Sequence, residues 1–277
     1  KTFIGTKALE ELDDERLLSK CSIVDMEIQK DWRDTLNATR HFVKEKADLI
    51  LVIGGDGTSR IVSKASADTP LLSLSSGTNN VIPERISSST AGAAAGFFLS
   101  LGGAERKKVS KRHKRLSVFI NGEEIDHALI DVTILDEEFS GSKAVWNPAS
   151  IRQIFVSRAH PKNIGLSNIV GVVKIVSPDK DGGASLRISE NGKKIAAAIE
   201  PGRFRKLGIS ELEEMDTGVH YPLIDIRPLQ IALDGEREHA LYDGDEATIQ
   251  LKTDGPRFLD IDGIMDLAIE KKAFYFD

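Results

Sequence analysis

One turn, Gly54-Gly55-Asp56-Gly57-Thr58, strongly constrains how this chain folds, because it stands between an apolar run at residues 49–53 and a helix-compatible segment at residues 59–64. Glycines there allow a positive φ and a close backbone approach to a ligand, and a helix start offers free amide N–H groups. This geometry favours phosphate. A carboxylate is unexpected in an anion-binding turn, so Asp56 is predicted to act on a substrate hydroxyl. The alternative is an ordinary connection in which Asp56 caps the helix.

The two best-known phosphate-binding signatures are absent from the sequence. No Gly-x-x-x-x-Gly-Lys-Ser/Thr and no Gly-x-Gly-x-x-Gly occurs, so neither a Walker-type NTPase nor a Rossmann dehydrogenase is supported. The turn at residues 54–58 is therefore interpreted as a different phosphate-binding device.

Length, charge and cysteine content restrict the class of protein. A chain of 277 residues is expected to form two domains. The net charge of −6 argues against a general nucleic-acid binder, and a single cysteine, Cys21, excludes an intrachain disulfide framework. No apolar run approaches a membrane span and no signal-peptide pattern opens the sequence, which predicts a cytoplasmic protein without a membrane partner.

The first part of the chain alternates helical and strand patterns. Helical spacing runs from Trp32 to Val43, strand-like runs occupy residues 49–53 and 70–74, and an alanine-rich helix covers residues 91–101. Such alternation predicts an α/β domain with a parallel sheet, whose ligands lie beyond the carboxyl ends of the strands. Both polar turns, at residues 54–58 and 75–80, follow strands and are expected at that edge. We predict a nucleotide-binding domain at residues 1–112, to which residues 257–277 return.

From about residue 116 the pattern changes to β-hairpins. The dipeptides Asn121-Gly122, Asn191-Gly192 and Asp234-Gly235 each follow or separate strand-like runs and suit tight type I′ turns. Strand after strand without long helices predicts an all-β second domain, a β-sandwich, at residues 113–256.

A basic stretch precedes this change of pattern. It comprises Arg106, Lys107, Lys108, Lys111, Arg112, Lys114 and Arg115. Since no aromatic residues are interleaved, a solvated linker at the domain boundary is favoured over a phosphate-steering patch.

Several separated motifs, in this order, resemble one known superfamily. They are residues 51–58 with the glycine turn, Ser76-Gly77-Thr78-Asn79-Asn80, Ile164-Gly165-Leu166-Ser167, Glu200-Pro201-Gly202 and residues 232–238 with Asp234-Gly235-Glu236. The sequence is similar to the NAD kinases and diacylglycerol-type lipid kinases, and within them to the acetoin-catabolism protein X branch. The resemblance implies an α/β first domain and a β-sandwich second domain.

The same resemblance implies a function and residue roles. It implies ATP-dependent phosphoryl transfer to a hydroxyl, with Mg²⁺ and with NAD or a nucleotide-like acceptor in the interdomain cleft. Asp56 corresponds to the aspartate that holds the acceptor hydroxyl in NAD kinases, and Glu236 to the base proposed for lipid kinases; a charged hairpin turn is the equally weighted alternative for Glu236. The expected binding residues are Gly54, Gly55, Gly57, Thr58, Gly77, Thr78, Asn79, Asn80, Asp131, Gly165 and Ser167.

Departures from the family patterns bear on the substrate. Val81 stands where lipid kinases carry an acidic residue, which disfavours a lipid substrate. Ile130-Asp131 stands where NAD kinases carry Asn-Glu or Asn-Asp, so only the acid is kept. They also carry a Gly-Ser-Thr-Ala-Tyr segment where this chain has Ile164-Gly165-Leu166-Ser167-Asn168, which keeps the glycine and a hydroxyl but no tyrosine. Strand polarity for Asp131 and turn formation for Ser167, Asn79 and Asn80 are the structural alternatives.

Two other functions stay open at this stage. One is a kinase for another small hydroxylated metabolite, linked to acetoin, and the other is a non-catalytic nucleotide sensor. No histidine spacing indicates a metal site. A homo-oligomer, dimer or tetramer, is expected from the resemblance. The chain opens with Lys1-Thr2-Phe3-Ile4 rather than the family's usual first strand, so an N-terminal piece is expected to be missing.

Overall fold

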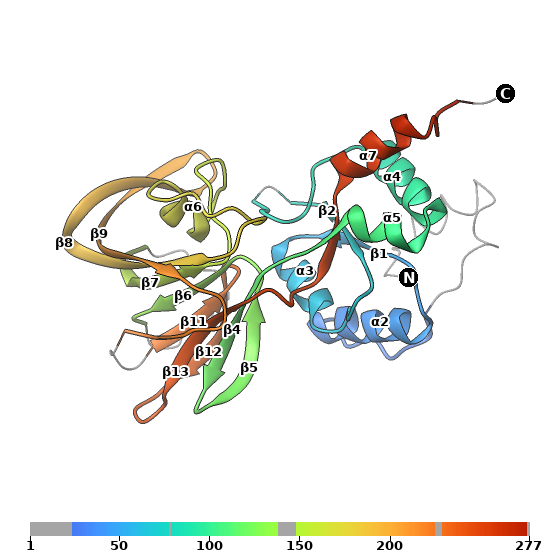
Figure 1. The fold of residues 1–277 in the computed structure, drawn as a ribbon. Helices are drawn as coiled ribbons and strands as arrows, with labels where there is room; N and C mark the ends of the chain where they lie inside the picture. Colours follow the sequence, from blue (N-terminus) through green and yellow to red (C-terminus); the bar gives the residue numbers. More distant parts are fainter. Residues whose placement is uncertain (1–23, 78, 138–147, 225–228, 276–277) are drawn as a thin grey trace.

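A computed structural model of the chain describes residues 24–77, 79–137, 148–224 and 229–275. An α/β part and a β-rich part lie side by side (Figure 1). The chain crosses between them twice, after β3 (Ser110–Arg112) and before β14 (Arg257–Leu259). No helix in the described ranges is long and apolar enough to cross a membrane.

The α/β part is built from the first and the last segments of the chain. Its helices are α2 (Trp32–Lys44), α3 (Asp56–Ser63), α4 (Ser88–Ser100), α5 (Gly103–Lys108) and α7 (Ile261–Glu270). Its strands are β1 (Ile50–Gly54), β2 (Leu71–Ser75), β3 (Ser110–Arg112) and β14 (Arg257–Leu259).

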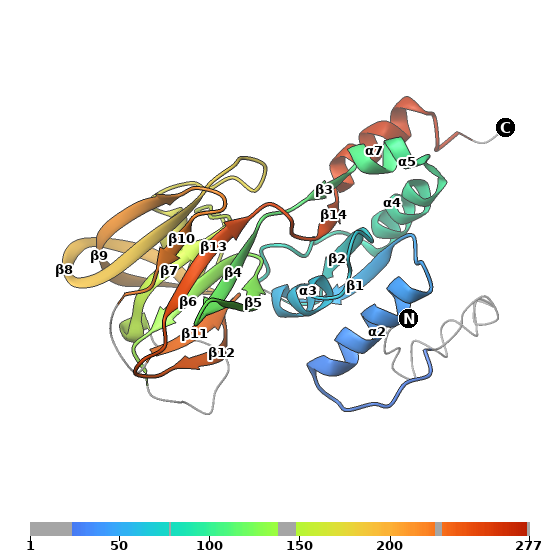
Figure 2. The ribbon, with the colours of Figure 1, turned by 60° about the horizontal axis from the view of Figure 1, so that its bottom comes forward.

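The sheet of this part has the order β1-β2-β14-β3, with helices on both faces (Figure 2). β1 and β14 run parallel to β2, as the alternating pattern predicts, whereas β3 pairs antiparallel with β14 at the edge. One face packs on α2 and α3, and the other packs on α4 and α7 through Leu72, Phe98 and Ile264. The carboxyl ends of β1 and β2 therefore present both polar turns at one edge, next to the second part.

The β-rich part contains the remaining elements. Its strands are β4 (Arg115–Ile120), β5 (Glu123–Ala128), β6 (Asp131–Leu135), β7 (Ile151–Val156), β8 (Gly183–Glu200), β9 (Arg203–Met215), β10 (His220–Pro222), β11 (Leu229–Leu233), β12 (Glu236–Leu241) and β13 (Ala247–Lys252). Its helices are a 3₁₀ turn, η2 (Pro148–Ser150), and α6 (Leu166–Gly171).

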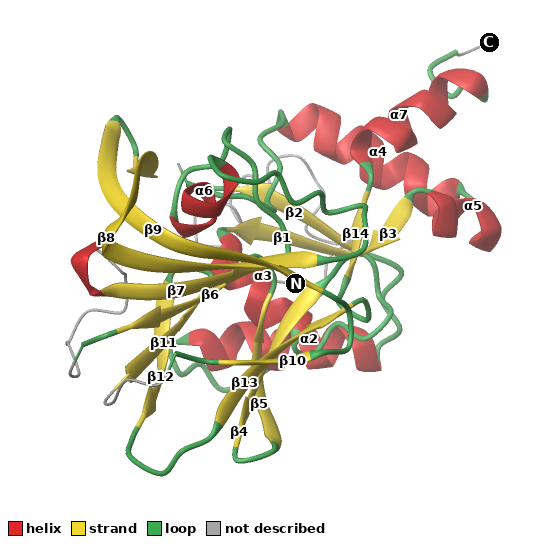
Figure 3. Cartoon of the chain, turned by 60° about the vertical axis from the view of Figure 1, so that its left-hand side comes forward, coloured by secondary structure: helices red, strands yellow, loops and turns green. Residues whose placement is uncertain are grey.

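These strands form two sheets that pack face to face (Figure 3). One sheet has the order β10-β13-β4-β5 and the other β12-β11-β6-β7-β8-β9. A shared core of Leu116, Val132, Leu229 and Ile249 joins them, which confirms the predicted sandwich. Because α6 covers the outer face of the larger sheet, every residue of β6 is buried, including Asp131.

Two of the three predicted tight turns are present. Asn121 and Gly122 both have positive φ between β4 and β5, and Asp234 and Gly235 do so between β11 and β12, as a type I′ turn requires. The prediction for Asn191-Gly192 was wrong.

β8 instead passes through residues 191–192 with an irregular register and turns at residues 201–202. Gly192 is needed there for a close approach of two strands, since a Cβ on it would lie 2.0 Å from the Ile209 carbonyl oxygen.

The basic stretch is neither a solvated linker nor an open phosphate patch, because most of its side chains have partners. Arg106 pairs with Asp48, Lys111 with Asp260 and Arg115 with Glu124 and Asp254. Lys114 is buried, and its Nζ donates to the carbonyls of Ser177, Lys180 and Gly182 at 2.6–2.8 Å. The charged side chains of the basic stretch therefore hold the linker against both parts of the chain.

Candidate functional site

The glycine turn lies at the start of α3, as predicted. Gly55 is the N-cap and has no side-chain capping bond, so Asp56 is not the helix cap. The amides of Gly57 and Thr58 have no hydrogen-bond partner among the described residues, and both residues line a cavity. Free amides at a helix start are suited to an anion.

The Asp56 carboxylate is fixed by the second polar turn. It accepts hydrogen bonds from the Val81 and Ile82 amides, each at 2.9 Å, and is 9% exposed. Burial raises the pKa of Asp56 to about 7, and the two backbone hydrogen bonds only partly oppose that rise. A carboxyl with this pKa can take up a proton at neutral pH, which an ordinary aspartate does poorly.

The second turn supports the first through one asparagine. Asn80 accepts from the Asp56 amide at 3.3 Å and donates to the Ser75 hydroxyl at 2.7 Å, which brings the two predicted turns together. Gly77 and Asn79 are exposed, and the Gly77 carbonyl accepts from Ser75 and Arg85. Thr78, also predicted to bind, lies outside the described residues.

Two further carboxyls are buried beside Asp56. Burial raises the pKa of Asp131 well above its ordinary value, and the neighbouring charges of Asp234 and Asp56 add to the rise. Asp234 accepts from the amides of Leu129, Ile130 and Asp131, and burial raises its pKa as well. Asp131 was predicted to be a site residue, whereas Asp234 was identified only as a turn residue.

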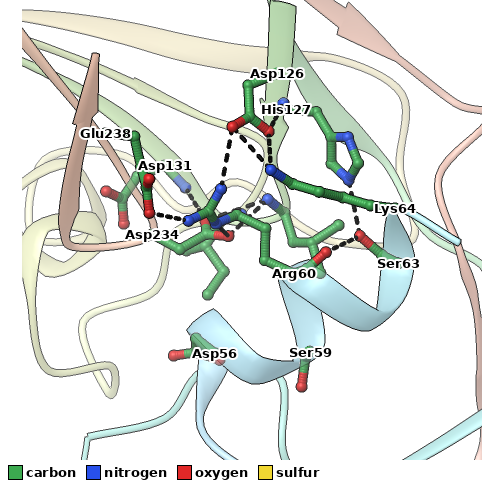
Figure 4. A network of polar contacts seen from close by, with 12 residues as sticks. Asp56, Ser59, Arg60, Ser63, Lys64, Asp126, His127, Asp131, Asp234 and Glu238 are labelled. Carbon is green, nitrogen blue, oxygen red and sulfur yellow. Dashed lines mark hydrogen bonds and ion pairs between the residues drawn. The ribbon is translucent and has the colours of Figure 1, made fainter. Parts of the chain in front are cut away.

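Arg60, which the sequence analysis missed, joins the two parts of the chain (Figure 4). It projects from α3 and is 1% exposed, with its guanidinium 2.5 Å from Glu238, 3.5 Å from Asp126 and 4.0 Å from Asp234. Lys64 and His239 also contact Asp126, and their hydrogen bonds hold the pKa of Asp126 well below its usual range despite burial. The sequence feature that could have identified Arg60 is its position, a cationic residue one helical turn after Asp56.

Glu236 approaches the glycine turn from β12. A Cβ on Gly57 would lie 3.0 Å from the Glu236 Oε1, so a glycine leaves room for this carboxylate. Both residues line a cavity of about 430 Å³, together with Trp32, Thr58, Lys64, Asp126 and His239. The cavity lies between the α/β part and the β-rich part.

Gly165 and Ser167 lie at the start of α6, which packs on β8, β7 and β6. Gly165 has a φ of 110°, and its amide donates to the Ala198 carbonyl at 3.0 Å. The buried Ser167 hydroxyl has no partner among the described residues. Asn168 is occupied structurally, since it bonds the Pro161 and Asn163 carbonyls and the Ala198 amide.

The described residues contain no group of three or more His, Cys, Asp or Glu side chains placed to hold a metal ion. Glu236 is the carboxylate that lies nearest the free end of α3 in the 430 Å³ cavity. Single carboxylates commonly hold Mg²⁺ together with substrate phosphates, so this arrangement suits Mg²⁺ that arrives with a polyphosphate.

Comparisons with known proteins agree with this architecture. The family model "ATP-NAD kinase N-terminal domain" matches residues 5–98, and "Acetoin catabolism protein X C-terminal domain" matches residues 114–254. The protein "Acetoin catabolism protein X" of Cupriavidus necator is 32% identical over 249 residues, which span 87% of this chain and 69% of that protein.

Two solved structures align over 98% of this chain at low identity. Yeast NADH kinase complexed with NADH is 13% identical, with a TM-score of 0.45 and 78% of that chain covered. An NAD kinase from Archaeoglobus fulgidus in complex with ATP is 15% identical, with a TM-score of 0.43 and 94% covered. The assignment below rests on the family models and on the 32% identical relative.

An α/β domain with this glycine turn, followed by a β-sandwich, places the chain in the NAD kinase-like class. Within that class, the chain belongs to the acetoin catabolism protein X family.

Replacing Arg60 with methionine is expected to destabilise the chain by about 3–5 kcal/mol, because it removes the buried cation that Asp126, Asp234 and Glu238 share. Urea unfolding measures the effect. Arg152→Met, which removes a partly exposed ion pair with Asp136, is the matched control and should cost about 1 kcal/mol or less. Equal effects of the two substitutions would contradict a stabilising role for Arg60.

The contribution of Asp56 to the free energy of unfolding should fall as the pH rises toward neutrality. Folding raises the Asp56 pKa from 3.8 to about 7, so its stabilising contribution is complete below about pH 4 and is lost as the pH rises through about 7. Asp56→Asn removes this titration and should gain a few kcal/mol relative to the unmodified chain between pH 4 and 8. Chemical unfolding between pH 4 and 8 measures this difference. If the free energies of unfolding of the two proteins change in parallel with pH, the raised pKa of Asp56 is refuted.

Two glycines of the turn should respond differently to alanine. A Cβ on Gly54 would lie 2.7 Å from the branched Thr58 side chain, so Gly54→Ala should destabilise the chain by about 1–3 kcal/mol. A Cβ on Gly57 meets only the flexible end of Glu236, so Gly57→Ala should fold nearly normally while displacing that carboxylate. Thermal unfolding distinguishes them, and a Gly54→Ala protein as stable as Gly57→Ala would contradict this packing.

Proposed function

We propose that the chain is an ATP-dependent kinase of the NAD kinase type that transfers a phosphoryl group to a hydroxyl of NAD or a nucleotide-like acceptor. The observation that carries the proposal is the Asp56 carboxyl, buried beside the glycine turn with a pKa of about 7. Phosphoryl transfer depends on positioning and charge neutralisation, and a carboxyl poised near neutral pH supplies the acid–base group.

Each part of the site has a role in this proposal. The free amides of Gly57 and Thr58 would bind phosphate oxygens of ATP in the cavity of about 430 Å³, with Gly54 and Gly55 allowing their approach. Asp56 would accept the proton of the acceptor hydroxyl while the hydroxyl oxygen bonds to the γ-phosphorus of ATP. The bond between that phosphorus and the bridging oxygen breaks, and ADP leaves.

Glu236 would hold Mg²⁺ together with the phosphates in this cavity. When bound, Mg²⁺ supplies neutralisation of the phosphate charge. The closeness of Glu236 to the glycine turn supports this role over the alternative of a hairpin residue alone, since a Cβ on Gly57 would lie 3.0 Å from its Oε1.

The acceptor would lie on the side of Asp56 that faces the buried carboxyls Asp131 and Asp234. Burial raises the pKa of Asp131 well above its ordinary value, which favours the protonated form that can donate a hydrogen bond to a hydroxyl. Gly77, Asn79 and Asn80 would border the same site. Gly165 and Ser167 would contribute from α6, where the buried Ser167 hydroxyl is without a described partner.

A second candidate is a kinase for another small hydroxylated molecule. Asn168 favours it, because its amide is fully used in bonds to the backbone at Pro161, Asn163 and Ala198. The side chain at this position is therefore not free to bind NAD. A cytoplasmic location and a homo-oligomer remain part of the proposal.

NADP formation by the purified protein with ATP, Mg²⁺ and NAD tests the proposal. Asp56→Asn should reduce the rate by about a hundredfold or more, since it removes the acid–base group. The matched control is Asp243→Asn, a substitution of the same kind at an exposed turn, which should retain full activity. If the unmodified protein binds ATP by calorimetry but forms no NADP, NAD is not the acceptor. Equal losses in both variants would exclude the assigned role of Asp56.

A further inference from the structure

A second cavity between the two parts of the chain, of about 410 Å³, has a different lining from the first. Val81 and Ile82, whose amides hold Asp56, separate it from the glycine turn. Its apolar walls include Leu71, Val176 and Phe258. A concave site with apolar walls and a few polar groups is the usual form of a small-molecule site.

Arg158 lies in this cavity and is buried without a carboxylate partner. It is 6% exposed, its Nε has no hydrogen-bond partner among the described residues, and it forms no ion pair within 4.0 Å there. Its recorded contact is from Nη2 to the His113 Nδ1, at 3.1 Å. Burial lowers the Arg158 pKa to about 10 and the His113 pKa well below its usual range, so the histidine is neutral and the arginine is still charged at neutral pH.

A buried cation without a counter-ion is costly unless a ligand supplies the negative charge. The nearby acids do not supply it at contact distance, although Asp56, Asp179 and Asp234 attract Arg158 electrostatically. A guanidinium with free N–H groups binds a carboxylate or phosphate in a fixed geometry.

The charges around Arg158 select between these two anions. The cavity lining also carries two other basic side chains, Lys111 and Lys162, and four acids: Glu84, Asp179, Asp260 and Asp262. Lys111 is already paired with Asp260 at 2.8 Å, and Lys162 is exposed. A ligand with a single negative charge matches Arg158, whereas a phosphate dianion or a polyphosphate would meet an excess of acids.

The wall opposite the sheet is firmly held. Ser177, Pro178 and Asp179 form part of it, and the buried Lys114 fixes this segment through the carbonyls of Ser177, Lys180 and Gly182. The cavity is therefore bounded by β2 and β14 on one side and, on the other, by a loop that Lys114 anchors from the segment before β4.

We propose that this cavity binds a small monocarboxylic acid, with its carboxylate on Arg158 and its apolar body against Leu71, Val176 and Phe258. The site is separate from the glycine turn, and the inference does not rest on the proposed kinase activity.

Calorimetric titration with acetate, butyrate and inorganic phosphate, without nucleotide and at constant ionic strength, tests the proposal. Butyrate should bind more tightly than acetate, because the apolar walls bury its additional methylene groups. The expected gain in affinity is about fourfold for each added methylene. Inorganic phosphate should bind more weakly than butyrate. Failure of the unmodified protein to bind butyrate, or tighter binding of phosphate, would overturn the proposal.

Variants locate the site. Arg158→Gln should weaken butyrate binding by tenfold or more with an unchanged or higher Tm, because the buried charge it removes has no counter-ion. The control is Arg152→Gln. Arg152 is a partly exposed arginine in β7, the strand that precedes Arg158, and its substitution should leave butyrate binding unchanged. Unchanged butyrate affinity in a folded Arg158→Gln protein would refute the role of Arg158.

A second measurement covers the case in which Arg158→Gln does not fold. In the unmodified protein, butyrate should shift the ring proton resonances of His113, which contacts Arg158, in a saturable way. The exposed His220 in β10 serves as the internal control and should not respond. A titration that leaves the His113 signals unmoved would contradict the proposal.

Discussion

The buried guanidinium of Arg60 is the interaction on which the arrangement of the site depends. It projects from the first helix after the glycine turn and meets carboxylates from three strands or turns of the β-rich part, namely Asp126, Asp234 and Glu238. An ion pair of this kind contributes little net stability compared with apolar packing, but losing one partner is expensive. It therefore fixes where α3, and with it the turn, lies relative to β5 and the β11–β12 hairpin.

Burial raises the pKa of each carboxyl around this contact, and the neighbouring cations decide which of them stay ionised. Asp126 touches Lys64 and His239 as well as Arg60, and these contacts keep it ionised. No cation among the described residues lies at ion-pair distance from Asp56 or Asp131, so burial dominates and favours their protonated forms. One cluster thus holds charged carboxylates that join the two parts of the chain and, in Asp56, a carboxyl that can exchange a proton near neutral pH. This separation of roles is typical of acid–base sites.

Much of the fold follows from local pattern. The strand–turn–helix at residues 50–63, the alternation that predicts a covered parallel sheet, and the Asn121-Gly122 and Asp234-Gly235 turns depend on nearby residues, and all are present. Asn191-Gly192 was mispredicted because a glycine required by a close strand crossing has the same sequence signal as a tight turn. The antiparallel edge strand β3 has no local signal of its own.

The site was only partly predictable for a similar reason. Asp56, Asn80 and Glu236 stand in motifs, and the structure brings them to the same interdomain region. Arg60, Asp234 and Arg158 acquire their importance from tertiary burial next to residues far away in sequence. Composition and periodicity do not indicate which cationic side chain becomes buried or which one lacks a counter-ion at contact distance.

Burial gives Asp56 a pKa of about 7, and the proposed chemistry depends on this value. An NMR titration of the aspartate carboxyl carbons in ¹³C-labelled protein, with the Asp56 signal assigned by its absence in Asp56→Asn, measures this directly. A midpoint at about pH 7 is the predicted result. A midpoint near the ordinary aspartate value of 3.8 would contradict the account, because Asp56 would then be a fully ionised carboxylate with no capacity to carry a proton at neutral pH.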